Sequence, residues 1–242
     1  MTVRALLHDD RPQRLLVIAA HPDDADFAAA GSVAGWVAQG TVAELVCCTS
    51  GDAGADDATT DPLALAATRE AEQRAAADIV GYAAVTFLHR PDGALANDLA
   101  LREQLVRIIR TFRPDAVAAP DPRVLIHEGG IVNHVDHRAA GEAAIDAVYP
   151  AARNPMAFPH LQRSEGLQPQ HVRRLYLFWA EHANAVVDIS DTLESKVRAL
   201  AAHASQLREP GGLIDHARQL AREAGASVGV RAGEPFAVID LR

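Results

Sequence analysis

The stretch LLVIAAHPDDADFAAAG, residues 15–31, contains a strand, a turn and the start of a helix. Its first six residues form an unbroken apolar run, which is typical of a strand buried on both faces of a parallel sheet. Pro22 has no backbone N–H to donate and disfavours helical geometry at the residue before it, so we expect the strand to end at His21. Asp23 and Asp24 then fall in the first turn of a helix, where negative charge suits the helix dipole.

Outside this stretch, apolar runs alternate with Ala-rich segments that have helical spacing. The alternation predicts an α/β fold with a mostly parallel sheet and helices on both faces, and we expect a single domain over residues 1–242. Such sheets bind ligands at the carboxyl ends of their strands. Irregular stretches rich in Gly, Asp, Pro and His predict the walls of a cleft and a loop-rich C-terminal portion. Further strands are expected at residues 42–49, 83–88, 116–119 and 173–179.

The charge balance and the cysteines exclude several classes of protein. Lys and Arg number 23 against 32 Asp and Glu, a formal net charge of −9, so no basic field attracts nucleic acid or anionic lipid. The apolar runs are too short to span a bilayer and residues 1–14 lack the apolar core of a signal peptide, so we expect a cytoplasmic protein without a membrane partner. Cys47 and Cys48 are adjacent in a predicted strand and point to opposite faces, which excludes a disulfide between them and a thiolate metal cluster.

The ionisable residues at the end of the first strand indicate a bound cation. His21, Asp23 and Asp24 crowd one turn, which leaves buried charge uncompensated unless a cation or a reaction needs it. His21 and Asp24 can offer an imidazole nitrogen and a carboxylate oxygen to one ion. A second loop, NHVDH at residues 133–137, supplies His137 as the third ligand. Two histidines, one aspartate and an open position form a donor set that suits catalytic zinc, and other divalent metals such as Fe²⁺ also bind it.

Three residues beside these predicted ligands suit catalysis. Asp23 is adjacent to a ligand and free to take the proton from a water molecule as the water attacks a carbonyl group. His134 can stabilise the oxyanion that forms or protonate the leaving group. Asp136 can accept a hydrogen bond from an imidazole and so fix its tautomer.

Two motifs carry a resemblance to a known family. AHPDDADFAAAG, residues 20–31, and HVDH, residues 134–137, resemble the PIG-L/LmbE-like family of metal-dependent N-acetylglucosaminyl deacetylases, with Val135 where the family has proline. Weaker matches follow in the family's order and extend the resemblance over most of the chain. They are TSGDAG at residues 49–54, Arg69 with Glu72, HRPDG at residues 89–93, and VVDISDTLESKVRALAAHASQL at residues 186–207.

The resemblance implies a Rossmann-like three-layer sandwich. It also implies hydrolysis of an acetamide, usually on a small N-acylated amino sugar or a glycoconjugate. Carried over residue by residue, it implies a zinc ion held by His21, Asp24 and His137. Asp23 would be the general base, and His134 the electrostatic catalyst or general acid.

Substrate contacts also follow from the resemblance. Arg69 and Asp92 fall at positions similar to those where members of the family touch the sugar, with a helix salt bridge and a turn aspartate as the structural alternatives. Some members have a mobile tyrosine where this chain has Val132. A phenolic oxyanion donor must therefore come from elsewhere, or His134 and the metal suffice.

Other classes of protein fit parts of the same pattern. Non-haem iron oxygenases use the same ligand types, and a sugar-binding relative could keep the metal without turnover. A dinucleotide-binding module is disfavoured, because the turn at residues 21–24 carries two acids and no Gly-x-Gly element. Acetate release measured against oxygen consumption separates the hydrolase from the oxygenase. The sequence leaves assembly into a homo-oligomer open.

Overall fold

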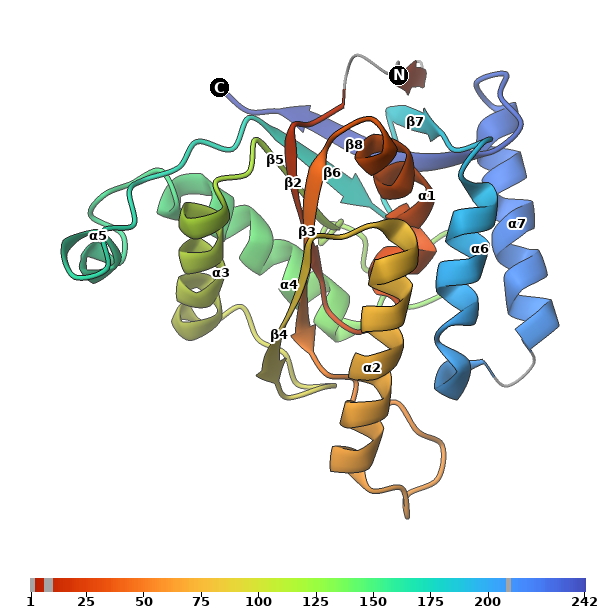
Figure 1. Ribbon diagram of the computed structural model, residues 1–242, viewed down its shortest axis with the longest axis horizontal. Coiled ribbons are helices and arrows are strands. Elements are labelled where there is room, and N and C mark those ends of the chain that lie inside the picture. The colour runs from red at the N-terminus through yellow and green to blue at the C-terminus, as the bar shows by residue number, and fades with distance from the viewer. Residues whose placement is uncertain (1–2, 7–10, 208–209) are drawn as a thin grey trace.

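The computed structural model describes residues 3–6, 11–207 and 210–242, and its central sheet is drawn in Figure 1. Eight strands join one sheet in the order β1-β7-β8-β6-β5-β2-β3-β4. Neighbouring strands are parallel, except that β8 runs antiparallel to both β6 and β7. The strands are β1 (Arg4–Leu6), β2 (Arg14–Ala19), β3 (Val42–Thr49), β4 (Ala84–Arg90), β5 (Ala116–Pro120), β6 (Arg174–Phe178), β7 (Ala185–Asp188) and β8 (Gly233–Asp240).

Helices cover both faces of the sheet (Figure 1), which confirms the expected three-layer α/β arrangement. Helices α1, α2, α6 and α7 pack on one face, and α3, α4, α5 and η2 pack on the other. No helix within the described ranges has both the length and the apolar composition needed to cross a membrane. The helices are α1 (Asp24–Ala38), α2 (Pro62–Val80), α3 (Leu99–Phe112), α4 (Val135–Asp146), η2 (Ala147–Ala151), α5 (Pro159–Arg163), α6 (Leu193–Ala201), η3 (Ala204–Gln206) and α7 (Pro210–Ala226).

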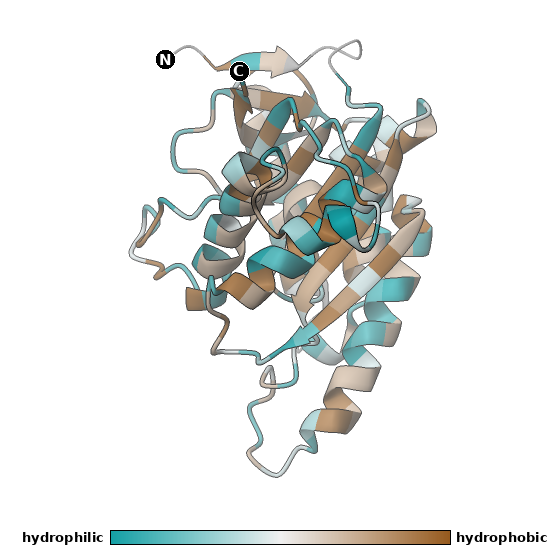
Figure 2. Cartoon of the chain, turned by 90° about the vertical axis from the view of Figure 1, so that its left-hand side faces the viewer, coloured by the Kyte–Doolittle hydropathy of each residue, from teal (hydrophilic) through white to brown (hydrophobic). Residues whose placement is uncertain are grey.

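Strand β2 connects the two hydrophobic cores of the molecule. Residues 15–20 are fully buried, and their side chains alternate between the faces of the sheet. Leu15, Val17 and Ala19 enter the core under α1 and α2, whereas Leu16 and Ile18 enter the core under α3 and α4. Figure 2 shows hydrophobic residues along the strands and hydrophilic ones on loops and outer helix turns. The apolar run read from the sequence is therefore buried on both sides.

The strand order places a binding crevice at the end of β2. β2 lies between β3 and β5, so the chain continues to one side of it and later returns to the other. Ligands of open α/β sheets bind at such a switch point, outside the carboxyl ends of the strands. His21 follows β2, and residues 121–134 connect β5 to α4. The two predicted metal-binding loops therefore meet at one edge of the sheet.

Candidate metal centre

The turn after β2 places the Asp24 carboxylate between two imidazoles. Asp24 Oδ2 accepts hydrogen bonds from the backbone N–H groups of Ala20 and His21, both at 2.9 Å, and lies 3.6 Å from His21 Nδ1. The other oxygen, Oδ1, lies 3.2 Å from Nε2 of His137. Burial opposes ionisation of Asp24, but the neighbouring charges of His137 and His21 lower its pKa well below the usual range. The structure thus brings the three predicted ligands together.

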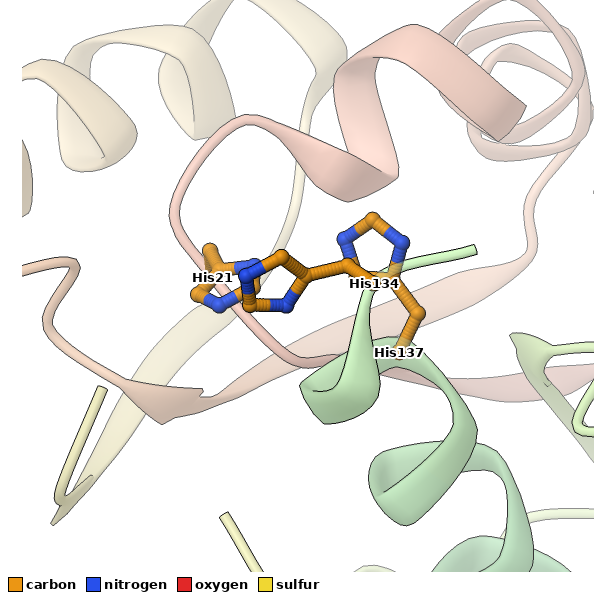
Figure 3. A group of neighbouring side chains, drawn as sticks. All are labelled: His21, His134 and His137. Atoms are coloured by element: carbon orange, nitrogen blue, oxygen red, sulfur yellow. The ribbon is translucent and has the colours of Figure 1, made fainter. Parts of the chain in front are cut away.

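A third imidazole, from His134, completes a group of three in Figure 3. The ring centroids of His21 and His134 are 4.8 Å apart, and those of His134 and His137 are 5.3 Å apart. His134 is the N-cap residue of α4, and its Nδ1 accepts the backbone N–H of Asp136 at 3.2 Å. Nitrogen atoms of all three rings lie within 4.8 Å of one another. Two groups of donor atoms lie close enough together to hold a divalent metal: His21 with His134 and His137, and His21 with Asp92 and Asp136. The predicted set of His21, Asp24 and His137 is supported by the two contacts of the Asp24 carboxylate.

Asp136 fixes His21 from the side opposite Asp24. Its side chain is fully buried, and Oδ2 lies 3.2 Å from His21 Nε2. The same carboxylate accepts the backbone N–H groups of Gly93 at 2.7 Å and Leu95 at 3.0 Å. Burial opposes ionisation of Asp136, yet these hydrogen bonds lower its pKa. Asp136 therefore joins α4, the loop after β4 and the imidazole of His21.

Asp92, predicted to touch the sugar, lies beside the same imidazole. Its Oδ1 is 3.0 Å from His21 Nε2, and its Oδ2 accepts the backbone N–H of Ala53 at 2.9 Å. Burial raises the pKa of Asp92, but hydrogen bonds from His21 and Ala53 outweigh burial and lower it to about 2. For His21, burial has the opposite effect and lowers the pKa. The nearby carboxylates of Asp24, Asp136 and Asp92 outweigh burial and raise the pKa of His21 to about 12. Negative charge therefore dominates the surroundings of His21.

Asp23 is held by Gln73 and Arg69 in a strained conformation. Its φ is 95°, and its backbone N–H donates to Gln73 Oε1 at 2.8 Å. Its side chain accepts from Arg69 Nη2 at 3.2 Å. Burial and the charge of Asp24 raise the pKa of Asp23 to about 6, although Arg69 opposes this shift. Strained backbone that is fixed from several sides is common at active sites.

Arg69, the other predicted sugar contact, is buried beneath this turn. Its guanidinium donates to the carbonyl oxygens of Pro22 at 2.8 Å and Gly51 at 3.0 Å, in addition to Asp23. Only 4% of Arg69 is exposed. In this structure Arg69 therefore positions Asp23, and a contact with the sugar stays a prediction.

Two residues near the site were not predicted from the sequence. Trp179 follows β6, and its ring centroid lies 4.6 Å from that of His137. Its position at the end of a predicted strand could have marked it as a residue of the binding crevice. Gln73 lies in the middle of α2, where no sequence signal marks it. It joins the Asp23 backbone to Asp26, which pairs with the buried His203 at 2.8 Å.

The sequence is similar to a family of known deacetylases. Residues 16–148 match the family model PIG-L, GlcNAc-PI de-N-acetylase. The diacetylchitobiose deacetylase of Thermococcus kodakarensis is 32% identical over 200 residues, which covers 81% of this chain and 71% of that relative. A 1D-myo-inositol 2-acetamido-2-deoxy-alpha-D-glucopyranoside deacetylase of Rhodococcus erythropolis is 28% identical over 239 residues and covers 81% of each chain.

A solved structure agrees with these sequence matches. The N,N'-diacetylchitobiose deacetylase of Pyrococcus horikoshii superposes with a TM-score of 0.87 at 30% identity, covering 96% of this chain and 85% of that one. The matched residues of the family model include both motifs that form the metal centre, at residues 20–31 and 134–137. The protein belongs to the PIG-L family.

Proposed function

We propose that this protein is a zinc-dependent hydrolase that removes an N-acetyl group from a small amino sugar or glycoconjugate. The observation that carries the proposal is the Asp24 carboxylate, which faces His21 with one oxygen and His137 with the other. Asp23 lies next to it and is held apart by Arg69. Relatives named as deacetylases of acetamido sugars support the reaction and the substrate class.

His21, Asp24 and His137 would hold the metal, because the cap of α4 commits His134 to a different role. Nδ1 of His134 accepts the backbone N–H of Asp136, so in the neutral ring the proton resides on Nε2. A protonated nitrogen donates a hydrogen bond and cannot ligate. His21 Nδ1 and His137 Nε2, by contrast, both face Asp24. A divalent cation bound there supplies Lewis-acid polarisation of water and of the acetamide carbonyl.

Asp23 and His134 would then perform the proton chemistry. Asp23 accepts a proton from the attacking water molecule as the new C–O bond forms at the acetamide carbon. The Nε2–H group of His134 donates a hydrogen bond to the oxyanion, or passes a proton to the departing amine nitrogen, as the C–N bond breaks. The products are acetate and the free amine.

Three buried residues would keep this arrangement in place. Asp136 accepts from His21 Nε2, which leaves Nδ1 as the ligand nitrogen. Arg69 and Gln73 hold the side chain and the backbone of Asp23. No tyrosine stands at position 132, where Val132 is exposed, and His134 supplies the oxyanion donor in its place.

Acetate release tests the proposal. Purified protein with added Zn²⁺ is incubated with methyl 2-acetamido-2-deoxy-glucoside and with diacetylchitobiose, and oxygen consumption is followed in parallel. We expect stoichiometric acetate and amine without oxygen uptake. Oxygen uptake with substrate loss would instead support the iron oxygenase, and tight binding without turnover would support a sugar-binding relative. The cytoplasmic location, the single domain over residues 1–242 and a homo-oligomeric state stay predictions.

A further inference from the structure

A pocket lies beside Trp179, the residue that packs against His137 of the candidate metal centre. It has a volume of about 270 Å³ and is lined by residues from α1, α6 and α7, together with the ends of β6 and β8. For scale, an apolar cavity of roughly 150 Å³ is large enough to bind benzene. Its walls are mostly apolar; they include Phe27, Trp179, Ala217, Leu220 and Pro235.

One side chain belongs to both the pocket and the metal centre. The Trp179 ring packs against the ring of His137 at a centroid distance of 4.6 Å and also lines the pocket. Trp179 has a φ of 56°, a conformation that an L-residue keeps only where its surroundings require it. Phe27, on the α1 side of the pocket, donates its backbone N–H to the carbonyl oxygen of Asp23 at 3.0 Å. The pocket and the candidate metal centre therefore adjoin one another at Trp179.

The charged residues of the pocket are already committed to the fold. Lys196 and Glu234 line it, but both are buried and form an ion pair at 2.6 Å. Glu234 also accepts the backbone N–H groups of Gly31 and Ser32, and Lys196 donates to the carbonyl oxygen of Phe27. Because these charges are satisfied, and the third ionisable side chain of the lining is the exposed His216, recognition in the pocket depends mainly on apolar contact. Leu220, on the α7 side, is 51% exposed and so leaves apolar surface for a ligand to cover.

We infer that this pocket, defined here as the Trp179 pocket, binds an apolar group attached to the amino sugar. The inference rests on the proposed deacetylase function and adds a substrate class to it: 2-acetamido sugars that carry an aryl or alkyl aglycone. The names of the relatives share an acetamido sugar and differ in what is attached to it, a second sugar in one and inositol in another. In this chain, the Trp179 pocket offers mostly apolar contacts and so suits an apolar group better than either polyol.

The test compares phenyl and methyl 2-acetamido-2-deoxy-β-D-glucopyranoside by acetate release. We expect kcat/KM for the phenyl glycoside to exceed that for the methyl glycoside by about tenfold or more, since burying an aromatic group is worth at least that factor. Ala217→Phe, which fills the pocket, and Leu220→Asp, which makes it polar, should each reduce the ratio to about one. The matched control is Leu63→Asp, an 81% exposed position on α2, which should keep the ratio of the unaltered protein.

The outcomes separate this inference from the proposed function. If neither glycoside releases acetate, the proposed function itself is wrong. If the methyl glycoside is deacetylated but the phenyl-to-methyl ratio is near one, the function stands and the Trp179 pocket inference is overturned. A high ratio that survives both pocket variants also overturns it. A parallel pair, N-acetyl and N-hexanoyl methyl glucosaminide, identifies the remaining occupant: a preference for hexanoyl that the variants abolish would assign the pocket to the acyl chain and contradict our assignment.

Discussion

Two of the buried polar clusters along helix α1 differ in their charge balance. Beside the middle of the helix, Lys196 of α6 and Glu234 of β8 form a one-to-one ion pair. Both side chains hydrogen-bond to the backbone of α1. Lys196 donates to the carbonyl oxygen of Phe27, and Glu234 accepts from the N–H groups of Gly31 and Ser32. Each charge thus has a partner within the fold, as buried ions require. Such a cluster has a structural role.

At the start of the same helix, the carboxylates outnumber the imidazoles with which they pair. Asp24, Asp92 and Asp136 all lie beside the imidazole of His21, and Asp24 also faces His137. The buried guanidinium of Arg69 is directed to Asp23, on the other side of the turn. The comparison shows how a functional cluster can be distinguished from a structural one: its negative charge exceeds what the protein itself compensates, so a cation has a place there.

The largest effect is expected from removing a proposed metal ligand from the cluster at the start of α1. His137→Ala should abolish stoichiometric zinc binding and lower acetate turnover by more than about 10⁴-fold, because every step then lacks the Lewis acid. Elemental analysis and the acetate assay measure both quantities. His182→Ala, at an exposed histidine outside the cluster, is the control and should change neither. Full zinc occupancy in the His137 variant would show that the third ligand is a different residue.

Removing the base sharpens the comparison within the functional cluster. Asp23→Asn should lower kcat by roughly 10² to 10⁴ while the zinc content stays at one per chain, because proton transfer is lost and the ligands are not. The exposed Asp191 provides the matched control Asp191→Asn, which should be silent. Unchanged turnover in the Asp23 variant would remove Asp23 from the base role.

Breaking the balanced cluster should affect stability and leave metal binding in place. Lys196→Ala is expected to lower the free energy of unfolding by about 3 kcal/mol, since Glu234 stays buried without a cation and keeps only the backbone donors of Gly31 and Ser32 and the Ser32 hydroxyl. Denaturant unfolding at a fixed zinc concentration measures the change. The exposed pair of Arg218 with Glu194 is the control, and Arg218→Ala should cost less than about 1 kcal/mol. Equal losses for the two variants would contradict a structural role for the buried pair.

The smallest effect is expected from a residue that touches a ligand without being one. Asp136→Asn keeps the side-chain size but removes the charge that fixes the tautomer of His21, so the dissociation constant for zinc should rise about 10- to 100-fold. Competition with a fluorescent chelator measures the affinity. An unchanged zinc affinity would mean that Asp136 serves only the loop at Gly93 and Leu95.

Much of this fold could be predicted from the sequence, because the strands at its centre are buried on both faces. The predicted strands near residues 14–20, 42–49, 83–88, 116–119 and 173–179 correspond to β2, β3, β4, β5 and β6. Strands β1, β7 and β8 were not predicted. β8 contains Glu234 and Pro235, which interrupt its apolar pattern, and the burial of Glu234 makes sense only with its partner Lys196. Such long-range pairing leaves no local signal.

In the candidate site, too, some features could be predicted from the sequence and others could not. His21, Asp24 and His137 could be placed together because strand-end position and residue type both indicate a ligand. The direction of Arg69 could not, because it depends on space that another loop leaves free. A side chain at Gly51 would put its Cβ 2.4 Å from Cζ of Arg69, so the glycine is what lets the guanidinium enter beneath Asp23.

The most direct test of the central claim is a zinc-edge anomalous diffraction map of the crystallised protein. We expect one peak per chain, at about 2.0–2.2 Å from His21 Nδ1, an Asp24 oxygen and His137 Nε2, with the Asp23 carboxylate outside this shell. A peak coordinated by His134 in place of Asp24, or zinc bound only away from the end of β2, would contradict the account.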